Sequence, residues 1–167
     1  MTNYRRDHSP EASWFFTLNL TDRRQVLLTA RIDLLRDSFR SVMRQHPWLI
    51  DAIVILPDHL HALCTLPADD ADYALRWRLI KTAFTRALPR GGPLSASRQR
   101  KGERGIWQRR YWERLMRDEH DYRAHVDYIH YNPVKHGHAT TAAEWPHSSF
   151  RHWVGRGAYS LDWASAP

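Results

Sequence analysis

The sequence predicts an α+β domain: a ferredoxin-like (RRM-like) antiparallel sheet built in the order β-α-β-β-α-β, followed by one more helix. Three observations support this class: short apolar runs rich in β-branched or aromatic residues, apolar stripes at helical spacing between them, and a Pro-Asp turn joining two adjacent runs. Strands that form a tight hairpin and are flanked by helices are typical of such folds. The length of 167 residues suits a single domain, predicted over 1–167.

The first half of the chain is expected to supply three strands and one helix. Residues 14–20 (WFFTLNL) form an aromatic, β-prone run. A stripe at steps of four and three predicts a helix that ends at Pro47: Leu28, Ile32, Leu35, Phe39 and Val42. Residues 48–56 (WLIDAIVIL) and 59–66 (HLHALCTL) are predicted as a hairpin around the turn at Pro57.

The second half is expected to contain two helices and the fourth strand. One helix carries the stripe Tyr73, Trp77, Ile80, Phe84 and Ala87, with Asp70 or Asp72 as its N-cap. Residues 89–105 show no periodicity, which predicts a mobile basic loop, and 111–117 are predicted as a strand. The last helix is expected over 118–131, because Asn132 precedes a proline. Residues 140–167 are predicted as an irregular, aromatic and basic tail.

Charge and cysteine content narrow the function classes. The net charge of +7 favours a polyanionic partner. The single cysteine, Cys64, excludes an internal disulfide and a CxxC zinc site. No apolar run approaches the roughly 20 residues of a membrane helix, and the first residues lack the apolar core of a signal peptide. We therefore expect a cytoplasmic protein with no membrane partner.

Two histidines stand one residue apart in the second hairpin strand. Alternate residues of a strand share one face, so His59 and His61 point the same way and Leu60 points to the opposite face. Neutral imidazole nitrogens at this spacing can hold one divalent cation, if a third ligand comes from elsewhere. The alternative is a histidine pair that is merely hydrogen-bonded near a strand end.

The last helix offers a candidate third ligand and a candidate nucleophile. Its apolar stripe consists of Tyr122, Val126 and Ile129. Tyr128 and Asn132 lie one turn apart and off this stripe, an arrangement suited to a phenol acting beside a metal held partly by an amide oxygen. A surface tyrosine followed by a helix-capping asparagine explains the same spacing. Tyr131, at the helix end, remains a rival nucleophile.

The segment 86–117 has the composition of a nucleic-acid-binding surface. It holds ten Lys or Arg residues and two acids, with Trp107, Tyr111 and Trp112 among them. Arginines meet phosphates and aromatic rings stack on bases, although a solvated basic loop is the simpler alternative. Trp107 is the tryptophan that we expect to stack, whereas Trp14, Trp48 and Trp77 are expected in the core. The predicted DNA-binding residues are Arg5, Arg6, Lys81, Trp107, Arg109, Arg110 and Lys135.

Three stretches together resemble the REP-associated tyrosine transposases, relatives of the single-tyrosine HUH transposases. They are LPDHLHAL, then IWQRRYWERLMRDEHDYRAHVDYIHYNPVKHG, then EWPHSSFRHW, and the resemblance extends from about Tyr4 to Trp163. The ordered set is far more specific than an isolated H-x-H.

The resemblance implies a fold, a chemistry and a partner. It implies that His59 and His61 are the metal ligands, that Asn132 is the third ligand, and that Tyr128 on the added helix is the catalytic nucleophile. It implies Mg²⁺ or Mn²⁺ as cofactor, and cleavage of single-stranded DNA at REP-type hairpins through a 5′-phosphotyrosine. It also implies a monomer rather than a dimer, and a tail over 140–167 that contacts DNA. The main alternative is a sequence-specific nucleic-acid-binding regulator that keeps the fold without turnover; a metal-dependent hydrolase and a basic structural module are further rivals.

Overall fold

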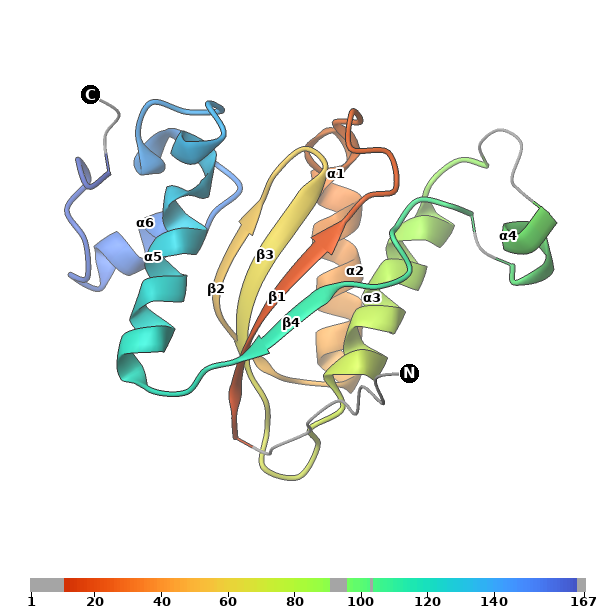
Figure 1. Ribbon diagram of the computed structural model, residues 1–167, viewed down its shortest axis with the longest axis horizontal. Coiled ribbons are helices and arrows are strands. Elements are labelled where there is room, and N and C mark those ends of the chain that lie inside the picture. Colours follow the sequence, from red (N-terminus) through yellow and green to blue (C-terminus); the bar gives the residue numbers. More distant parts are fainter. Residues whose placement is uncertain (1–10, 91–95, 103, 165–167) are drawn as a thin grey trace, which may run out of the picture.

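The protein, described by a computed structural model over residues 11–90, 96–102 and 104–164, has a four-stranded sheet with helices on both faces (Figure 1). The strands are β1 (Ser13–Asn19), β2 (Leu49–Ile55), β3 (His59–Thr65) and β4 (Trp112–Leu115). Their order in the sheet is β2-β3-β1-β4, and every neighbouring pair is antiparallel. The predicted α+β class and order of elements are confirmed.

One face of the sheet is covered by α2 (Ile32–Gln45) and α3 (Tyr73–Ala87). A separate turn of helix, α1 (Leu27–Ala30), precedes α2, so the first predicted helix is interrupted at Arg31. The Asp72 side chain accepts a hydrogen bond from the Leu75 N–H at 2.8 Å and caps α3, which selects one of the two predicted caps. The larger core lies on this face and includes Phe16, Leu18, Leu60, Ala62, Trp14, Trp48 and Trp77.

The opposite face carries α5 (Glu119–Lys135), which packs against β2 and β3. Because side chains alternate along a strand, β1 and β3 bury one set of residues under α2 and α3 and present the other set to α5. A second, smaller core forms between them from Phe15, Ala52, Val54, Leu56, Leu63, Val126 and Ile129. This second interface positions the candidate site.

The prediction that the last helix ends at Asn132 is wrong, because α5 continues through Pro133 to Lys135. The chain leaves the helix at Gly137, just beyond the C-cap His136, where φ is +72° and the Gly137 and His138 N–H groups donate to the carbonyls of Val134 (3.0 Å) and Pro133 (2.8 Å). This is a Schellman motif, which needs a residue that tolerates the left-handed region. The extra turn brings Lys135 and His136 onto the same side of the molecule as the histidine pair.

The tail is more ordered than the sequence predicts. It contains the 3₁₀ turn η1 (Ala142–Glu144) and the helix α6 (Phe150–Gly155). The Ile55 N–H donates to the His147 carbonyl at 2.8 Å, and the Ser149 N–H donates to the Ile53 carbonyl at 2.9 Å. The tail therefore covers the outer edge of β2, so the predicted irregular structure of 140–167 is wrong for these elements. These hydrogen bonds pair backbone groups that an exposed strand edge would leave unpaired.

The basic segment also contains regular structure. Residues Ala96–Arg100 form a short helix, α4, within the range 89–105 for which the sequence predicted only a loop. Arg5 and Arg6 lie outside the described residues. Within the described ranges, no helix has the length and apolar character needed to cross a membrane.

His130 on α5 fastens the tail to the helix and provides a test of this packing. Its ring is fully buried among Phe150, Trp153 and Tyr159, and its Nε2 lies 2.9 Å from the Ser149 hydroxyl. Burial lowers the pKa of His130 from 6.5 to about 4. The unfolded chain then binds the proton more tightly, so stability falls as the pH drops from about 6.5 towards 4, by up to about 1.4 kcal/mol per pH unit.

We expect His130→Gln to lower the free energy of unfolding at pH 7 and to reduce its further loss between pH 7 and 5. Urea denaturation at both pH values measures this difference. The matched control is His152→Gln on the exposed surface of α6, which is expected to keep the wild-type pH dependence. An unchanged pH dependence in His130→Gln would contradict the assignment.

Candidate active site

His59 and His61 lie together on the α5 side of β3, as strand alternation predicts. Their ring centroids are 5.0 Å apart with the planes nearly perpendicular, and both side chains are buried. Leu60, between them, is fully buried in the larger core on the opposite face. The leucine therefore fixes the strand while the two imidazoles face the same space.

Hydrogen bonds leave one nitrogen of each ring able to bind a cation. The Nδ1 of His59 has two partners, the Asp58 carboxylate at 2.7 Å and the Arg23 guanidinium at 3.2 Å. The shorter contact, to a group that only accepts, favours a hydrogen on Nδ1 and leaves the Nε2 lone pair for a ligand. The Nδ1 of His61 lies 2.8 Å from the Thr17 hydroxyl. The His61 Nε2 is buried with no hydrogen-bond partner among the described residues.

Both histidines are held in the neutral form that binds metals. Burial lowers the pKa of His61 to about 3, and the charges of His59 and His136 add to this effect. Burial also lowers the pKa of His59, although the Asp58 carboxylate opposes the shift. Burial alone would raise the pKa of Asp58, but hydrogen bonds from Arg23 and His59 outweigh it and lower that pKa. A neutral imidazole that is oriented by a carboxylate is the usual state of a metal ligand.

Asn132 brings an amide oxygen to the same place. Its side chain is fully buried, and its Nδ2 donates to the Tyr128 carbonyl at 2.8 Å. Its Oδ1 has no hydrogen-bond partner among the described residues, and the amide lies near enough to His61 to oppose the lowering of that pKa. His61 Nε2 and Asn132 Oδ1 are therefore two buried polar atoms near each other, and neither meets a partner at normal hydrogen-bond geometry among the described residues. Leaving each one unpaired costs about 1–3 kcal/mol.

This donor set fits a small divalent cation. Two neutral imidazole nitrogens and one amide oxygen can serve as three ligands of one divalent cation, and the imidazoles favour Mn²⁺ over Mg²⁺ in affinity. In the part of the chain that the structure describes, no three His, Cys, Asp or Glu side chains gather closely enough to form a metal site by themselves. A metal site built on the histidine pair would therefore need a ligand of another kind, and the Asn132 amide oxygen is placed to supply it.

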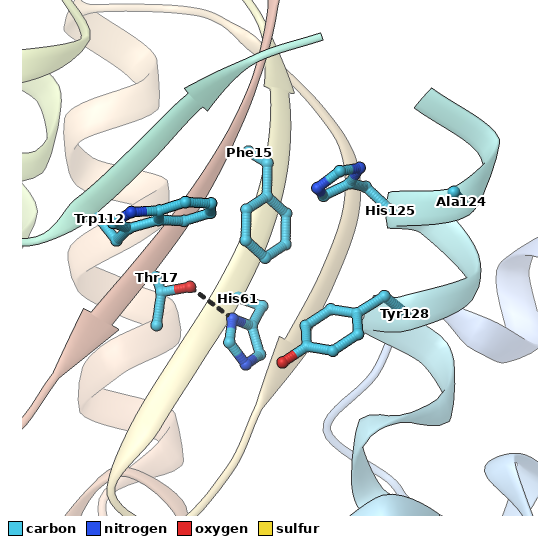
Figure 2. A pocket seen from close by; sticks show the side chains of 7 residues that line it. All are labelled: Phe15, Thr17, His61, Trp112, Ala124, His125 and Tyr128. Carbon is cyan, nitrogen blue, oxygen red and sulfur yellow. Dashed lines mark hydrogen bonds between the residues drawn. The ribbon is translucent and has the colours of Figure 1, made fainter. Parts of the chain in front are cut away.

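Tyr128 lies beside the histidine pair. Its ring centroid is 5.3 Å from that of His61, and Figure 2 shows its hydroxyl directed towards the His61 ring. The Lys135 ammonium lies 4.7 Å from the centroid of the Tyr128 ring, so a positive charge accompanies the phenol. Lys135 is the predicted DNA-binding residue that the structure brings to this site.

The other two tyrosines on α5 are placed differently. Tyr122 is held by a hydrogen bond to Asp51, and burial raises its pKa. Tyr131 is 42% exposed. Neither ring contacts His59 or His61 among the described residues, so Tyr128 is the tyrosine of α5 whose ring lies against the histidine pair.

The remaining predicted binding residues are not gathered at the site. Lys81 donates to the Gln108 carbonyl at 2.9 Å, and Arg109 lies 3.3 Å from the Ser97 hydroxyl; both line a surface hollow beside α3, on the other face of the sheet. Arg110 is exposed next to them. These residues form a separate basic surface rather than part of the histidine site.

The structure corrects the choice of tryptophan. Trp107 is 8% exposed and packs against Phe84 in the larger core, so the prediction that it stacks on bases is wrong. Trp112 is 55% exposed and lines a cavity with His61 and Tyr128 (Figure 2). Strand alternation could have found it, because Trp112 pairs with Thr17 and shares the α5 face of the sheet.

His136, whose ring lies 5.4 Å from that of His59, was also missed, because the predicted helix end excluded it.

Comparisons with known proteins identify relatives of the whole chain. No family model matches the sequence. The chain is 44% identical to the REP-associated tyrosine transposase of Escherichia coli K12, over 98% of this chain and 92% of that protein. It is 45% identical to a Haemophilus influenzae protein assigned to the same group, over 100% of this chain and 96% of that one.

A solved structure extends the likeness to three dimensions. It is a REP-associated tyrosine transposase bound to a REP hairpin, and it matches with a TM-score of 0.85 and 44% identity, over 99% of this chain and 92% of that chain. Identity at this level over nearly complete chains, with the same fold, establishes common membership. The chain belongs to the family of REP-associated tyrosine transposases.

Proposed function

We propose that this transposase cleaves single-stranded DNA beside REP-type hairpins, with Tyr128 as nucleophile and His59, His61 and Asn132 as metal ligands. One observation carries the proposal: the Tyr128 ring packs against His61, where the buried atoms His61 Nε2 and Asn132 Oδ1 have no hydrogen-bond partner among the described residues. The hairpin substrate is supported by the relative whose structure contains a REP hairpin.

The chain's own residues account for the steps around the phosphate. The Tyr128 oxygen attacks the phosphorus while the bond to the 3′ oxygen breaks, which leaves a 5′-phosphotyrosine and a strand that ends in a 3′-hydroxyl. The phenol loses its proton, and the departing 3′ oxygen gains one. When bound, Mg²⁺ or Mn²⁺ would polarise a non-bridging phosphate oxygen and offset the developing charge. Lys135 adds a positive charge beside the phenolate and the phosphate.

A covalent intermediate keeps the reaction reversible. Because the phosphodiester is exchanged for a phosphotyrosine ester, the strand can be rejoined or transferred without another energy source. One chain supplies both the histidine pair and the tyrosine that contacts it, which supports action as a monomer. A cytoplasmic location, where the DNA is, remains a prediction.

We expect Tyr128→Phe to abolish the protein–DNA adduct, a loss of several orders of magnitude as for other enzyme nucleophiles. Hairpin oligonucleotides labelled at the 5′ or the 3′ end, incubated with Mn²⁺ and run on a denaturing gel, measure this. The 3′-labelled fragment is expected to move with the protein, and the 5′-labelled fragment to be released. Tyr131→Phe is the matched control and is expected to retain the adduct.

Two outcomes would overturn the assignment. An adduct that survives in Tyr128→Phe would show that Tyr128 is not the nucleophile. A 5′ label that moves with the protein would show that the protein is joined to the 3′ end of the cleaved strand. A regulator without turnover would shift the hairpin on a native gel but give no denaturant-resistant adduct with the wild-type protein.

For the metal ligands, we expect His59→Ala or His61→Ala to abolish cleavage while hairpin binding changes by no more than about twofold, since both rings contact the metal rather than the hairpin stem. Asp58→Asn, which removes the carboxylate behind His59, is expected to weaken Mn²⁺ binding by about 10–100-fold. Electron paramagnetic resonance of free Mn²⁺ measures affinity independently of cleavage. His152→Ala, on the exposed side of α6, is the control. Undiminished Mn²⁺ binding in both histidine variants would show that His59 and His61 are not metal ligands.

A further inference from the structure

A cavity adjoins the candidate active site and shares His61 and Tyr128 with it, while its other walls play no part in the chemistry proposed above. It has a volume of about 610 Å³ and lies between the β1–β4 side of the sheet and α5. We call it the aromatic slot and define it by Phe15, Trp112, His125 and Tyr128, with Thr17 and His61 at its side towards the histidine pair (Figure 2). Its size falls within the range of about 300–1,000 Å³ that is usual for small-ligand sites.

The walls of the slot are rings that pack on one another. The Phe15 centroid lies 4.8 Å from that of His125, and 6.0 Å from those of Trp112 and Tyr128. Trp112 is nevertheless 55% exposed, which leaves much of a large apolar ring open to solvent. Such a surface attracts a flat apolar ligand and repels a phosphate, which would lose its hydration there.

Asp121, which does not line the slot, makes hydrogen bonds that hold its walls in place. Arg114, two residues after Trp112 on β4, donates to the Asp121 carboxylate on α5 at 3.1 Å. The His125 Nδ1 lies 2.8 Å from the Asp121 carbonyl, which only accepts, so this bond fixes the ring orientation. Asp121 therefore ties the strand that carries Trp112 to the helix that carries Tyr128. A ligand would meet a preorganised site.

We propose that the aromatic slot binds one unpaired nucleobase of the cleaved strand, next to the scissile phosphate, with Trp112 as its stacking partner. The inference rests on the proposed function and deepens it. Tyr128 and His61 are shared by the slot and by the candidate active site, so a strand whose phosphate lies at the Tyr128 hydroxyl places its neighbouring base at the slot. Bases stack on aromatic side chains irrespective of sequence, whereas paired bases are already stacked and cannot enter.

The test uses a DNA hairpin with a REP-type stem and unpaired nucleotides on both sides. 2-Aminopurine replaces one unpaired nucleotide at a time, and its fluorescence is measured on binding to Tyr128→Phe protein in EDTA, where no cleavage is needed. We expect one flanking position to be quenched in the complex. Adding Trp112→Ala is expected to remove that quenching and weaken binding about tenfold, while Trp112→Phe retains most of both. Tyr131→Ala, which removes an exposed aromatic ring outside the slot, is the control and is expected to leave both unchanged.

A change in the DNA gives the same test without relying on how well a variant folds. An abasic site at the quenched position is expected to weaken binding about tenfold in Tyr128→Phe protein and to have little further effect once Trp112 is also alanine. The proposal is overturned if no unpaired position depends on Trp112, or if the dependent positions all lie in the paired stem. If the wild-type protein forms no covalent adduct with Mn²⁺ while Tyr128→Phe protein still shows Trp112-dependent quenching, the proposed function alone is overturned. If the wild-type protein forms the adduct but no quenching depends on Trp112, the slot alone is overturned.

Discussion

The packing of α5 across β2 and β3 is the contact on which the candidate active site depends. The histidine pair lies on a central strand, but Tyr128, Asn132 and Lys135 all come from this one helix. Val126 and Ile129 fix the helix against the sheet through the smaller core, and Phe15 touches both that core and the Tyr128 ring. Moving the helix by one residue along the sheet would separate the phenol from the imidazoles. The helix end at Gly137 and the tail bonded along β2 both hold the helix in this register.

The candidate site holds two of the buried polar atoms that have no hydrogen-bond partner among the described residues. Two buried lone pairs, on His61 and Asn132, lack partners among the described residues, and burial keeps both histidines neutral. Each such group weakens the apo fold, and each is what a divalent cation needs. Locally unfavourable features of this kind are expected where binding or catalysis takes place. The surrounding apolar contacts and the Asp58 carboxylate keep the groups in position despite that cost.

Much of the fold and the centre of the site could be predicted from sequence, because both follow from periodicity. Alternation along 59–66 placed His59 and His61 on one face and Leu60 on the other, and helical spacing placed Tyr128 one turn before Asn132. The errors came where tertiary context overrode a local signal. Pro133 predicted a helix end, yet the helix continues through it to Lys135 and the Schellman motif at Gly137 ends it later. Trp107 and Trp112 both lie in the basic segment, and composition alone does not show which ring is buried. In the structure Trp107 is buried and Trp112 is exposed.

The central claim is that Tyr128, and neither of its neighbours on α5, becomes joined to DNA. Its most direct test is to digest the wild-type adduct formed on a hairpin substrate with Mn²⁺, and to locate the nucleotide-bearing residue by tandem mass spectrometry. We expect a single modified peptide with the nucleotide on Tyr128. A nucleotide on Tyr122 or Tyr131, or a cleaved substrate with no modified peptide at all, would contradict it.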